Sequence, residues 1–297
     1  MDSVALDTFV AVHRAGGFSQ AADALGRSQP AISRRIALLE DELGAALFER
    51  AAGGVVLSQA GRELMPHALR ALAALKDAGE AVRALQASPA GPLSVAVVGT
   101  LAGADLTKVL RRFVKAWPSV KLSLSTGTSA EISATVRRGD ATIGLRYHDD
   151  PSPDLALRRL RAERLTVVCA REHRFAGKRV RDLGALREEH WFAFPGADVW
   201  RDASAVNIFA QFVTRGIAEI DWTPVDSLTA QKRLIEAGFG LALVPERGVR
   251  EELAAKTLNV IHVGGLNAAN PVVAITRKDG YLSAAARVLL DDLAASF

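Results

Sequence analysis

The most constraining feature of this 297-residue chain is a change of pattern near residues 87–92. Small residues and two prolines interrupt a long helical pattern there, in the run Ala87-Ser88-Pro89-Ala90-Gly91-Pro92. Upstream, apolar residues recur at helical spacing with one short exception, and downstream, strand-like and helix-like segments alternate. The chain is therefore predicted to join an all-α part to a larger α/β part with largely parallel sheets.

Three compact helices are predicted upstream of residue 45. The first ends at Gly16-Gly17. The second is expected to start at Ser19, whose hydroxyl can cap free amides, and the third follows Ser28 and tolerates Pro30 in its first turn. The third helix has apolar residues at intervals of four, three and four, namely Ile32, Ile36, Leu39 and Leu43. Short helices joined by a tight glycine turn are typical of a helix-turn-helix unit.

The polar face of the third helix suits contact with DNA. With the apolar residues inward, Arg34 and Pro30 point outward, Ser33 lies beside them, and Gln29 lies at the helix tip. Glutamine pairs with adenine, arginine with guanine, and serine with phosphate. Arg35 lies at the edge of the apolar stripe, where an ion pair with a carboxylate such as Glu40 or Glu49 is at least as well supported as a contact with DNA. Residue types alone favour a cap at Ser28 and a solvated charge at Arg34.

A longer pattern decides between these alternatives. The order Gly17-Phe18-Ser19-Gln20-Ala21-Ala22, Ser28-Gln29-Pro30-Ala31-Ile32-Ser33 and Leu57-Ser58-Gln59-Ala60-Gly61 resembles the N-terminal domain of LysR-type transcriptional regulators. The resemblance implies a winged helix-turn-helix over residues 1–58. It also implies contacts with double-stranded DNA from Ser19, Gln20, Ser28, Gln29, Pro30, Ser33, Arg34 and Arg50.

Two positions depart from the family pattern. The wing after Arg50 reads Ala51-Ala52-Gly53-Gly54-Val55-Val56 and lacks the basic residue that family members often place there, which leaves phosphate contacts to Arg50 and backbone amides. Ser58 stands where the family usually has threonine, and its hydroxyl can still cap the next helix.

Residues 59–87 are predicted to form a linker helix that pairs two chains. Its apolar residues alternate spacings of four and three, as in a heptad seam, at Leu64, Ala68, Ala71, Leu75, Ala78, Val82 and Leu85. An amphipathic helix that packs on its own domain is the alternative. A homodimer or homotetramer would present two recognition helices to an operator with dyad symmetry.

Residues 91–297 resemble the family's effector domain, a periplasmic-binding-protein-like fold of two Rossmann-like lobes. Strand-like runs begin at Leu93 and return at Val272, with crossing segments near Arg161–Leu165 and Gly264–Asn267. Lobe I is expected to comprise about 91–162 and 268–297, and lobe II about 163–267. Such a domain would bind its ligand between the lobes.

The candidate effector residues follow strands, where ligands of open α/β sheets lie. They are Thr100, Thr128, Ser129 and Arg146 in lobe I, and Phe194, Pro195, Ser227 and Thr229 in lobe II. Hydroxyls and free amides at helix starts favour an anion, most simply the carboxylate of a small organic effector. The alternative is that each hydroxyl is only a helix cap.

The distribution of charge refines this expectation. The formal net charge is +4, yet residues 1–90 contain nine basic and ten acidic side chains, a net of −1. The remaining residues hold 28 basic and 23 acidic side chains, a net of +5. We expect DNA binding to rest on the placement of a few residues, and the C-terminal excess to suit an anionic ligand, although surface lysines and arginines would also account for it.

Other classes of protein receive little support from the sequence. It contains no Gly-x-Ser-x-Gly elbow, His-Glu-x-x-His motif, phosphate loop or paired-cysteine spacing, so neither an enzyme nor a cofactor or metal site is expected. A small-ligand-binding protein or enzyme of the same two-lobed fold is the alternative. Cys169 lies in an apolar run, and no run approaches the roughly 20 residues that cross a bilayer. We expect a cytoplasmic, effector-modulated transcription regulator, with RNA polymerase as a further candidate partner.

Overall fold

The computed structural model describes residues 1–297 except 52–53, 87–91, 195–207, 218 and 297. The N-terminal domain contains α1 (Ser3–Ala15), α2 (Phe18–Leu25) and α3 (Gln29–Leu43), followed by the hairpin β1 (Phe48–Ala51) and β2 (Gly54–Leu57). Its core is formed by fully buried residues from all three helices, among them Phe9, Ala21, Ile32 and Ile36. The predicted winged helix-turn-helix is confirmed.

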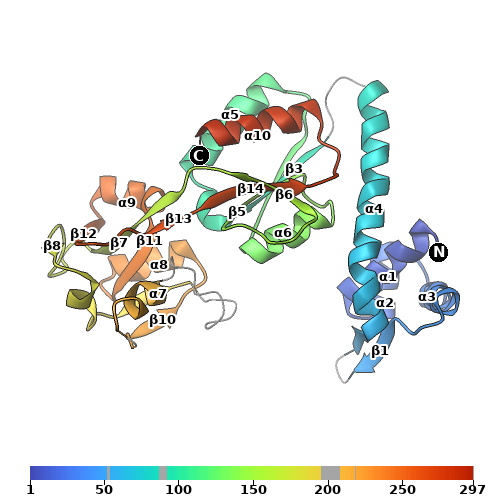
Figure 1. Ribbon diagram of the computed structural model, residues 1–297, viewed down its shortest axis with the longest axis horizontal. Helices are drawn as coiled ribbons and strands as arrows, with labels where there is room; N and C mark the ends of the chain where they lie inside the picture. Colours follow the sequence, from blue (N-terminus) through green and yellow to red (C-terminus); the bar gives the residue numbers. More distant parts are fainter. Residues whose placement is uncertain (52–53, 87–91, 195–207, 218, 297) are drawn as a thin grey trace.

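The long helix α4 (Gln59–Gln86) begins where a serine cap was expected. The Ser58 hydroxyl accepts a hydrogen bond from the Gly61 amide at 3.0 Å and donates one to the Ala46 carbonyl at 2.6 Å. The helix contains Pro66. Its first turns pack into the core of the N-terminal domain, and its later turns run beside lobe I (Figure 1).

Lobe I is built on a five-stranded sheet in the order β4-β3-β5-β14-β6. The strands are β3 (Leu93–Val98), β4 (Leu122–Gly127), β5 (Ile143–Tyr147), β6 (Leu155–Arg159) and β14 (Val272–Arg277). The helices are α5 (Ala104–Ala116), α6 (Ser129–Arg137) and α10 (Ala284–Ser296), with the short 3-10 helix Gly99–Leu101 before α5. α5 and α10 pack side by side over one face of the sheet, and α6 covers the other (Figure 1).

Lobe II contains a larger sheet in the order β10-β9-β11-β7-β12-β8. Its strands are β7 (Glu163–Ala170), β8 (Arg179–Val180), β9 (Trp191–Ala193), β10 (Trp222–Pro224), β11 (Leu241–Pro245), β12 (Leu258–Val263) and the short β13 (Ala269–Asn270), which pairs with β7. The described helices are α7 (Ile208–Val213), α8 (Leu228–Glu236) and α9 (Arg250–Ala255), with 3-10 helices at Leu183–Leu186 and Glu246–Val249.

Both sheets are mixed rather than largely parallel, which corrects the expectation from sequence. In each lobe three parallel strands form one side, and the strands next to the crossover run antiparallel to them: β14 against β5, and β7 against β11. The reason is the double crossing of the chain. β7 leaves lobe I and β13 returns to it, so the two pair antiparallel, with Ala269 opposite Arg164.

Candidate functional site

Helix α3 presents the polar face that its periodicity predicted. Ile32 and Ile36 are 1% exposed and face the domain core. Gln29, Pro30 and Arg34 are exposed, and Ser33 is half-buried beside them. Arg34 makes no ion pair or hydrogen bond with any residue that the structure describes. This guanidinium is available to a ligand outside the protein.

The capping residues differ from expectation. α2 begins at Phe18 after the N-cap Gly17, so Ser19 is not its cap; Ser19 and Gln20 lie exposed in its first turn. Ser28 is the N-cap of α3 by its extended backbone, yet its exposed hydroxyl makes no capping hydrogen bond. Neither hydroxyl is used to hold its helix in place.

Arg35 is engaged within the protein, but with a different partner from those considered. Its guanidinium lies 3.8 Å from the carboxylate of Asp2. Glu40 instead accepts hydrogen bonds from the amides of Leu47 and Phe48, at 2.7 and 3.3 Å, and fixes the start of the wing. Of the two alternatives for Arg35, an ion pair or a contact with DNA, the structure shows an ion pair.

The wing places Arg50 on the surface of β1, opposite Val55 of β2. The Val55 amide donates to the Gly16 carbonyl at 3.2 Å and ties the hairpin to the end of α1. Gly54 makes this approach feasible, because its φ is +135° and a Cβ there would lie 2.6 Å from the Gly16 oxygen.

A pocket of about 260 Å³ lies between the two lobes. Thr100 lines it from lobe I and Thr229 from lobe II, so two of the predicted effector residues meet in one cavity. The lining also includes the first residues of α5 and α8. Three acidic and three basic residues belong to it: Asp105, Glu163, Glu251, Lys232, Arg247 and Arg250. The sequence did not predict these charged residues, because the chain crossing between the lobes that brings them together is a property of the tertiary fold.

Ion pairs span this pocket. The Asp105 carboxylate on α5 lies 3.0 Å from Arg247 and 3.7 Å from Arg250, both of lobe II. Lys232 is 2.7 Å from Glu252 and donates to the Gly248 carbonyl at 3.2 Å. The Asp105 pairs thus hold the two lobes to each other, whereas the Lys232 contacts lie within lobe II.

A hydroxyl chain leads from the pocket into the crossover. The Thr100 and Tyr147 hydroxyls are 2.8 Å apart, and the Tyr147 hydroxyl donates to Glu163 at 2.5 Å. Burial raises the pKa of the Glu163 carboxyl above its ordinary value. Burial and the nearby Glu163 charge also raise the pKa of the Tyr147 phenol, which therefore stays a donor.

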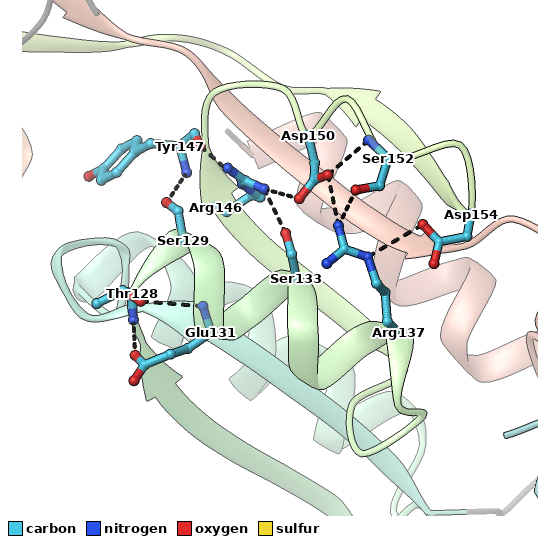
Figure 2. A network of polar contacts seen from close by, with 10 residues as sticks. All are labelled: Thr128, Ser129, Glu131, Ser133, Arg137, Arg146, Tyr147, Asp150, Ser152 and Asp154. Carbon is cyan, nitrogen blue, oxygen red and sulfur yellow. Dashed lines mark hydrogen bonds and ion pairs between the residues drawn. The ribbon is translucent and has the colours of Figure 1, made fainter. Parts of the chain in front are cut away.

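Arg146 lies in a network within lobe I (Figure 2). It forms an ion pair with Asp150 and donates to the Ser133 hydroxyl at 2.6 Å and the Tyr147 carbonyl at 3.1 Å. Arg137 also binds Asp150, at 2.9 Å. The structure therefore holds Arg146 as an internal support beneath α6, and it is not among the residues that line the interlobe pocket.

Two of the remaining candidate residues, Thr128 and Ser227, are helix caps. Thr128 forms a capping box with Glu131 at the start of α6, as Figure 2 shows, and Ser129 accepts from the Tyr147 amide at 3.3 Å. Ser227 caps α8 through the Ala230 amide at 3.4 Å. Phe194 is exposed after β9, and Pro195 lies outside the described residues.

Comparisons with known proteins decide the family. Residues 86–297 match the LysR substrate binding domain, and residues 4–62 match the bacterial regulatory helix-turn-helix protein, lysR family. The chain belongs to the LysR family. It is a DNA-binding transcriptional regulator with an effector-binding domain, and its relatives are regulators rather than enzymes.

Individual relatives support this assignment. The regulator IlvR of Caulobacter vibrioides is 32% identical over 249 residues, which is 80% of each chain. ShiR of Corynebacterium glutamicum is 32% identical over 242 residues, again 80% of each. The crystal structure of CbnR matches with a TM-score of 0.68 at 26% identity over 100% of this chain and 99% of that one, and CbnR complexed with its target DNA matches with 0.65 at 27% over 100% of both.

Within the described part of the chain, no helix of this LysR-family regulator has both the length and the apolar character that crossing a membrane requires.

Proposed function

We propose that this regulator reads its operator with α3, through Gln29, Ser33 and Arg34, and contacts phosphate with Arg50 of the wing. The observation that carries the proposal is the free Arg34 guanidinium on the exposed face, next to an Arg35 that is held by Asp2. Ser19, Gln20, Ser28 and Pro30 surround this face and would fix its position against the backbone. In this proposal the regulator acts on DNA in the cytoplasm and alters the access or the activity of RNA polymerase at the operator.

The later turns of α4 support assembly into a homodimer. Leu75 and Val82 are each 56% exposed, and Ala71 and Ala78 are exposed on the same face. The opposite face is occupied, because Ala73 is 2% exposed and Asp77 is buried against lobe I. The seam residues from Ala71 to Val82 are exposed while the opposite face of the helix is docked, which suits a second copy of the chain and would match an operator of dyad symmetry. Two such dimers would make the tetramer.

Two members of the predicted seam have another role in this chain. Ala68 is 1% exposed in the core of the N-terminal domain, and Leu64 packs against that core. The alternative that the helix packs on its own domain thus describes the first turns. Pairing is proposed for the seam from Ala71 onward to Leu85, whose side chain is not among those that the structure describes.

We propose that the effector is a small organic acid that binds between the lobes. Thr100, Thr229 and the amides at the starts of α5 and α8 offer donors to a carboxylate, with Lys232 in the same lining. The acidic groups of the lining, Glu163 above all, favour an effector that carries a hydrogen-bond donor beside its carboxylate. Closure of the lobes on this ligand would shift the spacing of the paired DNA-binding domains by its differential affinity for the two states.

The test uses the full-length protein in two steps. Duplexes selected from a random pool should share a motif with dyad symmetry, and a thermal-shift screen of small carboxylates should yield a ligand that changes the footprint on that motif. Thr229→Val should lose the ligand response, whereas Thr126→Val, an exposed threonine on β4, should keep it. Selection without any enriched motif would refute the role of α3, and the absence of any carboxylate-dependent shift would refute the effector class.

A further inference from the structure

The excess positive charge of the C-terminal part is concentrated in one segment. Residues 161–181 contain seven lysines and arginines and two glutamates, a net of +5 that equals the excess of the whole region after residue 90. One of the two glutamates, Glu163, faces the interlobe pocket. The function proposed above makes no use of this concentration of charge.

The fold gathers part of this segment around a second pocket. This basic pocket, of about 270 Å³, lies over β7, β12 and β8 of lobe II. Arg164 and Thr166 contribute from alternate positions of β7, and Arg179 of β8 pairs with His262 of β12 in the parallel ladder. The turn at Gly264-Gly265 completes the lining, with Gly265 in a left-handed conformation at φ +70°.

The charges of the basic pocket are uncompensated. None of the described residues that line it is acidic. Arg164, Arg179 and His262 form neither ion pairs nor hydrogen bonds through their side chains with any residue among those described. Neighbouring arginines of the same segment do have partners: Arg174 lies 2.5 Å from Glu189, and Arg181 lies 3.6 Å from Asp182. Two guanidiniums around one concavity repel each other, and an anion between them would remove this repulsion.

We infer that the basic pocket binds a small oxyanion with two or more negative charges, such as a phosphate ester or a polycarboxylate, at a site separate from the effector pocket. Guanidinium groups pair with carboxylate and phosphate oxygens through two parallel hydrogen bonds, so two arginines match more than one anionic group. The volume suits a compact ligand. The two pockets share no lining residue, and Glu163 and Arg164, consecutive on β7, face one pocket each.

The experiment measures binding to the full-length protein by calorimetry at constant ionic strength. The probes are glycerol 3-phosphate, inorganic phosphate and citrate, with acetate as the singly charged comparison. At least one of the first three should bind, and acetate should not compete with it. Because charged hydrogen bonds are each worth about 1.5–3 kcal/mol, Arg164→Gln and Arg179→Gln should each raise the Kd about tenfold or more.

The control variants separate this site from its surroundings. Arg171→Gln removes an exposed arginine of the same segment outside the basic pocket and should leave the Kd unchanged. Thr229→Val, in the effector pocket, should also leave it unchanged. If only the phosphate probes bind, or only citrate binds, the result supports the proposal and identifies the class of oxyanion. The proposal is overturned if no probe binds, or if the double variant Arg164→Gln, Arg179→Gln, with its circular dichroism intact, binds as the unmodified protein does.

Discussion

The carboxylate of Asp77 on α4 lies 2.5 Å from the guanidinium of Arg277 at the end of β14, 200 residues further along the chain. The second oxygen of Asp77 accepts from the Tyr281 amide at 3.1 Å. Close by, Lys76 donates to the Gly139 carbonyl at 2.6 Å, and Arg14 of α1 lies 3.3 Å from Asp140. The linker helix, and with it the DNA-binding domain, is thereby fixed to lobe I.

The Asp77–Arg277 pair should couple the two halves of the chain. Its side chains are 12% and 17% exposed, so Asp77→Ala leaves a half-buried guanidinium without its partner. We expect the free energy of unfolding to fall by about 1–3 kcal/mol. This loss should be seen as faster hydrogen exchange at the Tyr281 amide and a lower melting temperature. The matched control is Arg158→Ala, which breaks an exposed pair with Asp291 and should cost under about 1 kcal/mol. Equal effects from the two variants would remove the special role of Asp77.

Replacing Arg34 should weaken operator binding and relax base preference. Because a bidentate arginine–base contact is worth about 1–3 kcal/mol of discrimination, Arg34→Ala should raise the Kd for the selected operator by about five- to 150-fold, with a smaller change on unrelated duplex. Arg35→Ala, which breaks the ion pair with Asp2, is the control and should leave base preference intact. Unchanged affinity and footprint in Arg34→Ala would contradict the assignment.

Charges in the free seam of α4 should separate the chains. Leu75→Glu with Val82→Glu puts two like charges into each half of the proposed contact and should lower the sedimentation mass toward that of a single chain. Arg70→Glu, an exposed change on a different face of α4, should leave the mass unaltered. A double variant that sediments like the unmodified protein would show that α4 does not pair through this face.

Cys169 should not react with thiol reagents in the folded protein. Burial, together with the charge of Glu189, raises the pKa of its thiol to about 12, so almost no thiolate forms near neutral pH. We expect one reactive thiol per chain after denaturation, because the sequence has a single cysteine, and almost none before. Rapid labelling of the native protein with a thiol-reactive dye would be incompatible with this environment.

The sequence predicted those features that local periodicity determines. The spacing of Ile32 and Ile36 oriented α3 correctly, and the Ser58 cap and the bounds of β3 are found where the residues placed them. Arg146 shows the limit: as a cation just past a strand it suited a ligand, but Asp150 and Ser133, from a later loop and a neighbouring helix, hold it inside lobe I. Its orientation depends on tertiary neighbours that the position after β5 does not reveal.

The interlobe pocket shows the same limit in the other direction. Thr100 and Thr229 could be chosen because each follows a strand. Asp105 and Arg247 could not be paired from sequence, because only the double crossover brings α5 next to the 3-10 helix Glu246–Val249. The mixed sheets have the same cause, since a strand that enters from the other lobe runs against those already in place.

The Asp150 network should make lobe I sensitive to acid. Burial alone would raise the pKa of this carboxyl, but hydrogen bonds from Ser133 and Ser152 and the charge of Arg137 outweigh it and hold the pKa well below its usual range. A depressed pKa contributes stability that is present above the ordinary aspartate value of about 3.9 and is lost as the pH falls below it. Asp150→Asn leaves Arg137 and Arg146 without this carboxylate, so it should lower the free energy of unfolding by about 1–3 kcal/mol at pH 7. In melting experiments from pH 7 to pH 2, the gap between the two proteins should narrow below about pH 4. Asp279→Asn, at an exposed position, should follow the unmodified protein throughout. A gap for Asp150→Asn that stays constant down to pH 2 would show that the ionised carboxylate is not what stabilises this network.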